Sequence, residues 1–161
     1  AFRRLKNRSD HRQAVPWTKV KRIGLLCTAA TPEVRKQAGQ MADLFKDTQK
    51  QVQILGYYPG KIEDPGLFEF PVFSRKDLDI TQRPKGKTVD YFLQQPIDLV
   101  VCLENPIPAP LQFLLRVCPN ALRAGFYQDA GEEVLDLMVD ADEPEDAAQA
   151  IIEILKKVDR P

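Results

Sequence analysis

Two strand-length segments made almost wholly of apolar residues constrain this chain more than any other feature. They read VKRIGLLC at residues 20–27 and IDLVVCL at residues 97–103. An apolar run that does not alternate with polar residues is typical of a strand buried on both faces, as in a parallel sheet covered by helices. The sequence therefore predicts an α/β protein with these two strands in the interior of the sheet.

Helix and strand patterns alternate along the rest of the chain. After the first strand, Thr31 and Pro32 fit the start of a helix, and apolar residues recur with the helical period from Val34 to Phe45. Further strands are expected at 51–57, 121–126 and 135–139, with a short edge strand within 67–73 that Pro71 interrupts. Further helices are expected at 88–95, 111–117 and 144–158. This alternation predicts a three-layer sandwich with a mostly parallel, five-stranded sheet, flavodoxin-like or related Rossmann-like.

The last connection is unusually short for such a fold. Eight residues, 127–134, separate the last two expected strands, whereas a crossover between parallel strands usually takes about 10 to 12 or more. This leaves the direction of the last strand open, and an antiparallel strand is one of the two outcomes. We expect one α/β domain over residues 20–161, preceded by a basic arm over residues 1–19.

Charge is divided unevenly along a chain whose net charge is zero. Residues 1–22 carry eight Lys or Arg and one Asp, whereas residues 129–161 carry eleven Asp or Glu and three Lys or Arg. A basic segment attracts anionic partners, so Arg3, Arg4, Arg8 and Arg12 are candidate contacts for RNA, a ribonucleoprotein or an acidic protein surface. The alternatives are contact with the chain's own acidic end, or simple solvation.

Compartment and redox state follow from what the sequence contains. No apolar run approaches the 18 or so residues of a membrane helix, and no charged segment followed by an apolar one opens the chain, so a cytoplasmic protein is expected. Three cysteines without CxxC spacing cannot all pair. We expect Cys27, Cys102 and Cys118 to be reduced core residues rather than nucleophiles.

Residues for catalysis are scarce. The single histidine, His11, lies in the basic arm, so neither a Ser-His-Asp triad nor a histidine metal cluster can be built from the core. Residues 81–88 read TQRPKGKT and end like a phosphate-binding loop, but they lack its first glycine and the preceding strand. The glycines of a dinucleotide-binding loop are also missing after the first strand. We therefore predict no catalytic residue, no metal site and no bound cofactor.

One position could still hold a small ligand. In the expected fold the strands at 20–27 and 97–103 are neighbours at the point where the strand order reverses, and ligands of open α/β sheets bind there. Thr28, Thr31, Glu104 and Asn105 would then surround the crevice. Helix N–H groups near Thr31 favour an anion, and Glu104 and Asn105 suit a ribose, a sugar hydroxyl or an amine. The alternative for these residues is ordinary loop capping.

Several segments together resemble a known family. They are KRIGLL at residues 21–26, LGY at 55–57, FSRKDL at 73–78 and PIDLVVCL at 96–103, with the basic N-terminal tail. The chain resembles an uncharacterised bacterial family of small cytoplasmic proteins of unknown function, and the resemblance implies no catalytic residue. Separately, IDLVVCLE followed by an apolar helix and ALRAGF is similar to the N-terminal domain of two-domain glycosyltransferases. The chain has no room for their nucleotide-binding half.

Two functions follow as hypotheses. The first is a non-catalytic, Rossmann-like interaction module whose basic arm contacts an anionic macromolecule. The second is a small-molecule-binding protein, or an enzyme acting on a nucleotide or phosphorylated sugar, at the crevice beside Thr28 and Glu104.

Overall fold

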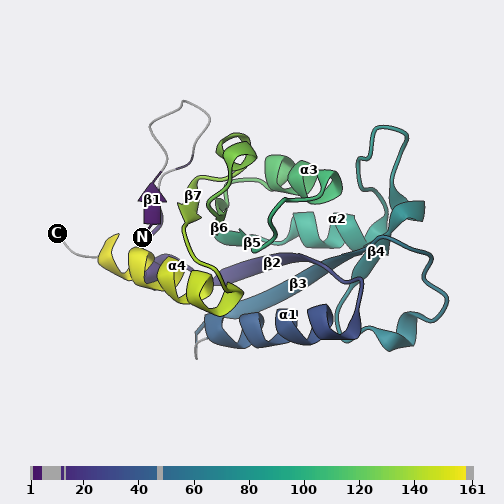
Figure 1. The fold of residues 1–161 in the computed structure, drawn as a ribbon, viewed down its shortest axis with the longest axis horizontal. Helices are drawn as coiled ribbons and strands as arrows, with labels where there is room; N and C mark the ends of the chain where they lie inside the picture. Colours follow the sequence, from purple (N-terminus) through teal and green to yellow (C-terminus); the bar gives the residue numbers. More distant parts are fainter. Residues whose placement is uncertain (1, 5–11, 13, 47–48, 159–161) are drawn as a thin grey trace.

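Six parallel strands form the centre of the protein (Figure 1). The computed structural model describes residues 2–4, 12, 14–46 and 49–158. The parallel strands are β2 (Arg22–Thr28), β3 (Gln51–Tyr58), β4 (Val72–Ser74), β5 (Leu99–Cys102), β6 (Leu122–Phe126) and β7 (Leu137–Val139). A short strand, β1 (Phe2–Arg4), pairs antiparallel with β7. The order across the sheet is β1-β7-β6-β5-β2-β3-β4.

Helices cover both faces of the sheet, as predicted (Figure 1). On one face lie α1 (Pro32–Phe45) and α4 (Pro144–Val158), whose buried residues form one core with inward side chains of β2, β5, β6 and β7. On the other face lie α2 (Lys87–Gln94) and α3 (Ala109–Val117), which enclose a second core. Because the central strands are buried between two helical layers, they need apolar residues at every position, which explains the continuous apolar runs.

Single residues in the sequence correctly predicted where several helices and strands begin or end. The Thr31 side chain accepts a hydrogen bond from Val34 N at 3.2 Å, which confirms it as the N-cap of α1. Pro71 precedes β4, so the expected edge strand is only three residues long. Two short 3-10 helices, η2 (Pro65–Leu67) and η3 (Arg75–Asp77), flank β4.

One expectation about the sheet was wrong, and the direction of the last strand, which the sequence left open, is parallel. The sheet has six parallel strands rather than five, because the edge strand β4 joins the five strands of the main pattern. The last strand is not antiparallel, since β7 pairs parallel with β6. The short crossover suffices because a 3-10 helix, η4 (Asp129–Glu133), turns the chain tightly, and Leu135 N donates to Gly131 O at 2.7 Å.

Part of the N-terminal segment packs on the domain. Trp17 begins a 3-10 helix, η1 (Trp17–Lys19), and is 7% exposed within the core between the sheet and α4. Arg12 N donates to Asp136 Oδ1 at 2.9 Å, and the Arg12 guanidinium donates to Ala121 O. Arg3 and Arg4 lie in β1, opposite Met138 and Leu137. Arg8 lies outside the described residues.

Candidate functional site

The candidate site lies where the strand order reverses. Counted in chain order, the parallel strands run 3-2-1-4-5-6 from β4 to β7, so the reversal falls between β2 and β5. These two strands pair in parallel from Ile23 opposite Leu99 to Leu26 opposite Cys102. Their carboxyl ends therefore meet at one edge, and Thr28 and Glu104 emerge side by side.

The predicted neighbours Thr28 and Glu104 are bonded to each other. The Thr28 hydroxyl donates to Glu104 Oε1 at 2.9 Å. Burial raises the pKa of Glu104, and the hydrogen bond from Thr28 offsets part of that rise because it stabilises the ionised carboxylate. The two polar groups that would meet a ligand at the crevice are thus bonded to each other.

Gln128, which follows β6, ties the next loop to the same place. Its Nε2 donates to Glu104 O at 2.9 Å and to Phe126 O at 3.3 Å, and its Oε1 accepts from Ile107 N at 3.3 Å. The Thr28 side chain therefore bonds to the Glu104 side chain, and the Gln128 side chain bonds to the Glu104 backbone, so the ends of β2, β5 and β6 are joined. Gln128 was not among the residues predicted from the sequence. The signal that pointed to Glu104, a polar residue shortly after a buried strand, applied to Gln128 as well.

The other two predicted ligand contacts lie further out. Thr31 is exposed and its hydroxyl caps α1, while Asn105 is exposed in the loop after β5. Arg35, in the first turns of α1, donates to Ala29 O at 2.8 Å and holds the β2–α1 loop against the helix. The structure thus brings Thr28 and Glu104 into contact, whereas it uses Thr31 for the local fold.

Little space remains beside Glu104. The cavity that Glu104 lines, together with Cys27 of β2 and Met41 of α1, measures about 30 Å³. That volume holds roughly one or two water molecules, whereas a drug-sized ligand needs about 300 Å³ or more. Pro144, at the start of α4, also lines this cavity and narrows it.

The thiols near the crevice are poor nucleophiles. Burial, and then the charge of Glu104, raises the pKa of Cys27 to about 12, and burial raises the pKa of Cys102 well above its usual value. All three cysteines are free and buried, which confirms that they are core residues. A thiolate nucleophile is therefore disfavoured at neutral pH.

A second feature of the structure is a buried ion pair between Arg123 of β6 and Asp136, which directly precedes β7. Asp136 also binds Arg12 and so holds the N-terminal segment. Arg123 and Asp136 are each 5% exposed, and Arg123 donates from Nε to Oδ2 at 2.9 Å and from Nη2 to Oδ1 at 2.7 Å. Asp136 also accepts from Arg12 N and Arg123 N, both at 2.9 Å. The sequence analysis missed this pair, although a charged residue inside an apolar strand pattern signals a buried partner.

No group of three or more His, Cys, Asp or Glu in the described part of the chain could hold a metal ion. None of the helices formed by these residues combines the length and the apolar character needed to span a bilayer.

The strand order and the crevice define a Rossmann-like α/β protein. Residues 2–158 match the family described as "Family of unknown function (DUF6913)", and the chain belongs to that family. No curated protein and no solved structure matches the chain. The resemblance to a family of unknown function is thereby confirmed. The description of the fold is based on the strand order of the structure itself.

Proposed function

We propose that this protein is a non-catalytic interaction module whose basic N-terminal segment contacts an anionic macromolecular partner. The observation that carries the proposal is the hydrogen bond between Thr28 and Glu104, which joins two of the protein's own side chains at the position where ligands of Rossmann-like folds bind. A nucleotide that used the Thr28 hydroxyl or the Glu104 carboxylate would compete with this bond. Its phosphates would then meet a carboxylate, which repels them whenever it is ionised.

The N-terminal segment has the charge and the attachment that such a role needs. Eight Lys or Arg lie within residues 1–22, and Arg12 fixes the segment to the domain through Asp136 and Ala121. In this proposal Arg12 anchors the segment, while Arg3, Arg4 and Arg8 contact the partner. Repeated phosphates suit several arginines at once, so RNA or a ribonucleoprotein is the first partner class, ahead of an acidic protein surface.

The test measures how binding of a single-stranded RNA depends on salt. Labelled RNA is titrated with the full chain by fluorescence anisotropy at several salt concentrations, and with a variant in which Arg3, Arg4 and Arg8 become glutamine. Arg12 and Trp17 stay, because both contact the domain. Each lost phosphate contact lowers the slope of log K against log salt by about 0.7, so the variant should lose about 2 in slope and bind weakly.

A control variant with the same change in charge separates local contact from net charge. It replaces three exposed lysines elsewhere on the surface by glutamine: Lys36, Lys61 and Lys85. We expect this control to keep most of the slope. Equal slopes for both variants would refute the proposed role of the segment. Binding of polyglutamate instead of RNA, lost in the arginine variant only, would assign the segment to an acidic protein surface.

A second candidate function is favoured by Glu104. Its burial raises its pKa, and a carboxyl group beside the Thr28 hydroxyl suits a sugar hydroxyl or an amine. The protein would then bind, or act on, a nucleotide or phosphorylated sugar after the crevice opens. A thermal-shift screen with nucleotides and sugar phosphates tests this, with Thr31→Val and Glu104→Ala as variants. Absence of stabilisation, or stabilisation that neither variant changes, would exclude it.

The finer parts of the family resemblance belong to the proposal as well. A cytoplasmic location fits three free cysteines, because cytosolic thiols stay reduced. The bacterial source is proposed from the family resemblance alone. The similarity to the N-terminal domain of two-domain glycosyltransferases supports the Rossmann-like fold. It gives no support for transferase activity.

A further inference from the structure

The outer edge of β3 is open along its first half. Gln51 N donates to Lys21 O and Ala29 N donates to Tyr57 O, so the odd-numbered residues of β3 bond to β2. The even-numbered residues point their N–H and C=O groups the other way, as Gly56 N does toward Pro71 O at 3.0 Å. Pairing with β4 covers Gly56 to Tyr58 and nothing before it. The backbone groups of Val52 and Ile54 therefore face outward with no strand beside them among the described residues.

Pro71 explains why the pairing stops there. To extend the ladder by one step, Ile54 C=O would have to accept from the N–H of residue 71, and proline has none. The chain before Pro71 accordingly leaves the edge of the sheet, and β4 begins at Val72. The opening is thus built into the sequence rather than left by a missing element.

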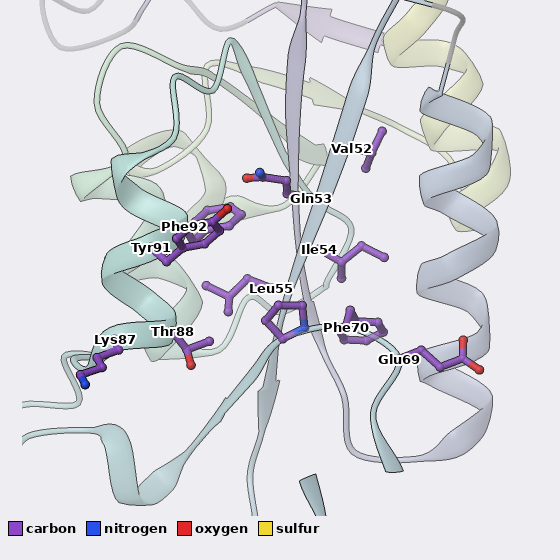
Figure 2. A pocket seen from close by; sticks show the side chains of 11 residues that line it. Val52, Gln53, Ile54, Leu55, Glu69, Phe70, Lys87, Thr88, Tyr91 and Phe92 are labelled. Atoms are coloured by element: carbon purple, nitrogen blue, oxygen red, sulfur yellow. The ribbon is translucent and has the colours of Figure 1, made fainter. Parts of the chain in front are cut away.

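Hollows lie on both faces of this open edge. On the α2 side, a groove of about 590 Å³ is lined by Leu55, Phe70, Tyr91 and Phe92, and on the α1 side another of about 630 Å³ also reaches Ile54. Figure 2 shows that Gln53 and Leu55 point toward α2, whereas Val52 and Ile54 point toward α1. An added strand would place its side chains alternately in these two hollows.

We propose that the open edge of β3 binds the same edge of a second copy of this chain, so that the two sheets join across a two-fold axis at Gln53. In antiparallel register Val52 lies opposite Ile54 of the second copy, and each such pair exchanges two hydrogen bonds. Both outward N–H groups and both outward C=O groups of each copy are then satisfied. A two-fold interface requires this kind of self-complementarity.

Gln53 supplies an independent reason for a second copy rather than another occupant. Its Oε1 is buried and has no hydrogen-bond partner among the described residues. On the proposed axis the two Gln53 residues face each other as a non-hydrogen-bonded pair, whose side chains lie closest in an antiparallel sheet. A turn of each amide lets one Nε2 donate to the other Oε1, which removes the cost of the unsatisfied atom.

The open part of β3 itself carries none of the residues that usually keep edge strands apart. Residues 51–55 read QVQIL and contain no charge and no proline, the usual means of blocking association. The opposite edge of the sheet, at β7, is covered by β1. Tyr91 is 62% exposed on α2 beside the open edge, where an aromatic side chain would be covered by the second copy.

The first test is the oligomeric state with a change confined to the outer backbone. Light scattering of the full chain during size-exclusion chromatography should give about twice the mass of the 18.3 kDa chain. Val52→Pro removes an outward N–H and leaves the bonds to β2 in place, so it should give a monomer with an unchanged circular dichroism spectrum. Val52→Thr keeps the N–H and the shape, and it should remain a dimer. A monomeric wild type, or a Val52→Pro dimer, would overturn the proposal.

The second test does not depend on the proline variant folding. Directly opposite residues of a non-hydrogen-bonded pair have Cα atoms about 4.5 Å apart, within disulfide range. Gln53→Cys should therefore cross-link two chains rapidly under mild oxidation, while the three native cysteines stay silent because they are buried. Gln51→Cys is the matched control, since its two copies would lie about 14 Å apart at about 3.4 Å per residue. Equal cross-linking of both variants, or none in either, would overturn the register.

Discussion

The buried pair of Arg123 and Asp136 gives the sharpest prediction about stability. Asp136 accepts four hydrogen bonds: two from the Arg123 side chain, one from Arg123 N and one from Arg12 N. Asp136→Asn keeps the size of the side chain but removes the carboxylate charge that faces the buried Arg123 guanidinium. Breaking such a pair costs about 3–5 kcal/mol, a large part of the 5–15 kcal/mol by which a domain is usually stable.

Urea unfolding measures this loss directly. The single tryptophan, Trp17, is buried and reports on the core that holds the N-terminal segment. With a slope of about 2 kcal/mol per molar urea, the midpoint should fall by about 1.5–2.5 M. A loss below about 1 kcal/mol would contradict the reasoning, because an exposed pair costs no more than that.

A double variant separates the unpaired charge from the lost packing. Arg123→Met removes the guanidinium, and asparagine at position 136 still offers an oxygen to the backbone donors. The double variant should therefore be more stable than Asp136→Asn alone. Additive losses from the two changes would refute the role of the buried charge.

The pH dependence has a definite sign. Burial alone would raise the pKa of Asp136, but the hydrogen bonds from Arg123 and Arg12 outweigh it, so the pKa is lowered in the folded state. The pair therefore stabilises the protein at neutral pH, and this stability is lost as the pH falls from the unfolded pKa of about 3.9 through the lower folded pKa. Asp136→Asn should lack this part of the acid dependence.

Further predictions concern the crevice and two glycines. Burial raises the pKa of Glu104 despite the Thr28 bond, so stability should fall as pH rises from the unfolded pKa through the folded one; Glu104→Gln should flatten that part of the curve in pH-dependent urea unfolding. Gln128→Ala loses three hydrogen bonds and should lower the free energy of unfolding in urea by about 1–3 kcal/mol. An unchanged free energy of unfolding would show that these bonds do not stabilise the protein. Gly125→Ala would place a Cβ 2.5 Å from a backbone carbonyl of β5 and should lower the melting temperature at a cost of about 1–3 kcal/mol, whereas Gly39→Ala, in open space on α1, should gain about 0.5–1 kcal/mol. Equal effects of the two alanines would contradict this.

The sequence predicted the main elements because local and tertiary signals agreed there. Continuous apolar runs located the buried strands, and Thr31 with Pro32 located the start of α1. The adjacency of Thr28 and Glu104 followed from one topological rule, since both residues lie at the carboxyl ends of neighbouring parallel strands. The contact between these two side chains needed the structure, because residue order does not reveal whether two polar groups satisfy each other.

Other features depend on long-range pairing that a single sequence does not display. Arg123 lies in β6 and Asp136 directly before β7, and each looks like a lone polar residue within an apolar pattern. The parallel direction of β7 depends on the compact η4 turn, whose five residues carry no helical period. The open edge of β3 arises because Pro71 has no N–H to donate to the Ile54 carbonyl. Only the register of the paired strands shows that these two groups would meet.

Native mass spectrometry of the full chain, compared with its denatured mass, tests most directly whether the protein's own side chains occupy the crevice. The native mass should be a whole multiple of the denatured chain mass, with nothing added. An excess of several hundred daltons that Glu104→Ala removes would show that a small molecule occupies the place where Thr28 and Glu104 now meet, and the proposed role as a non-catalytic interaction module would then be wrong.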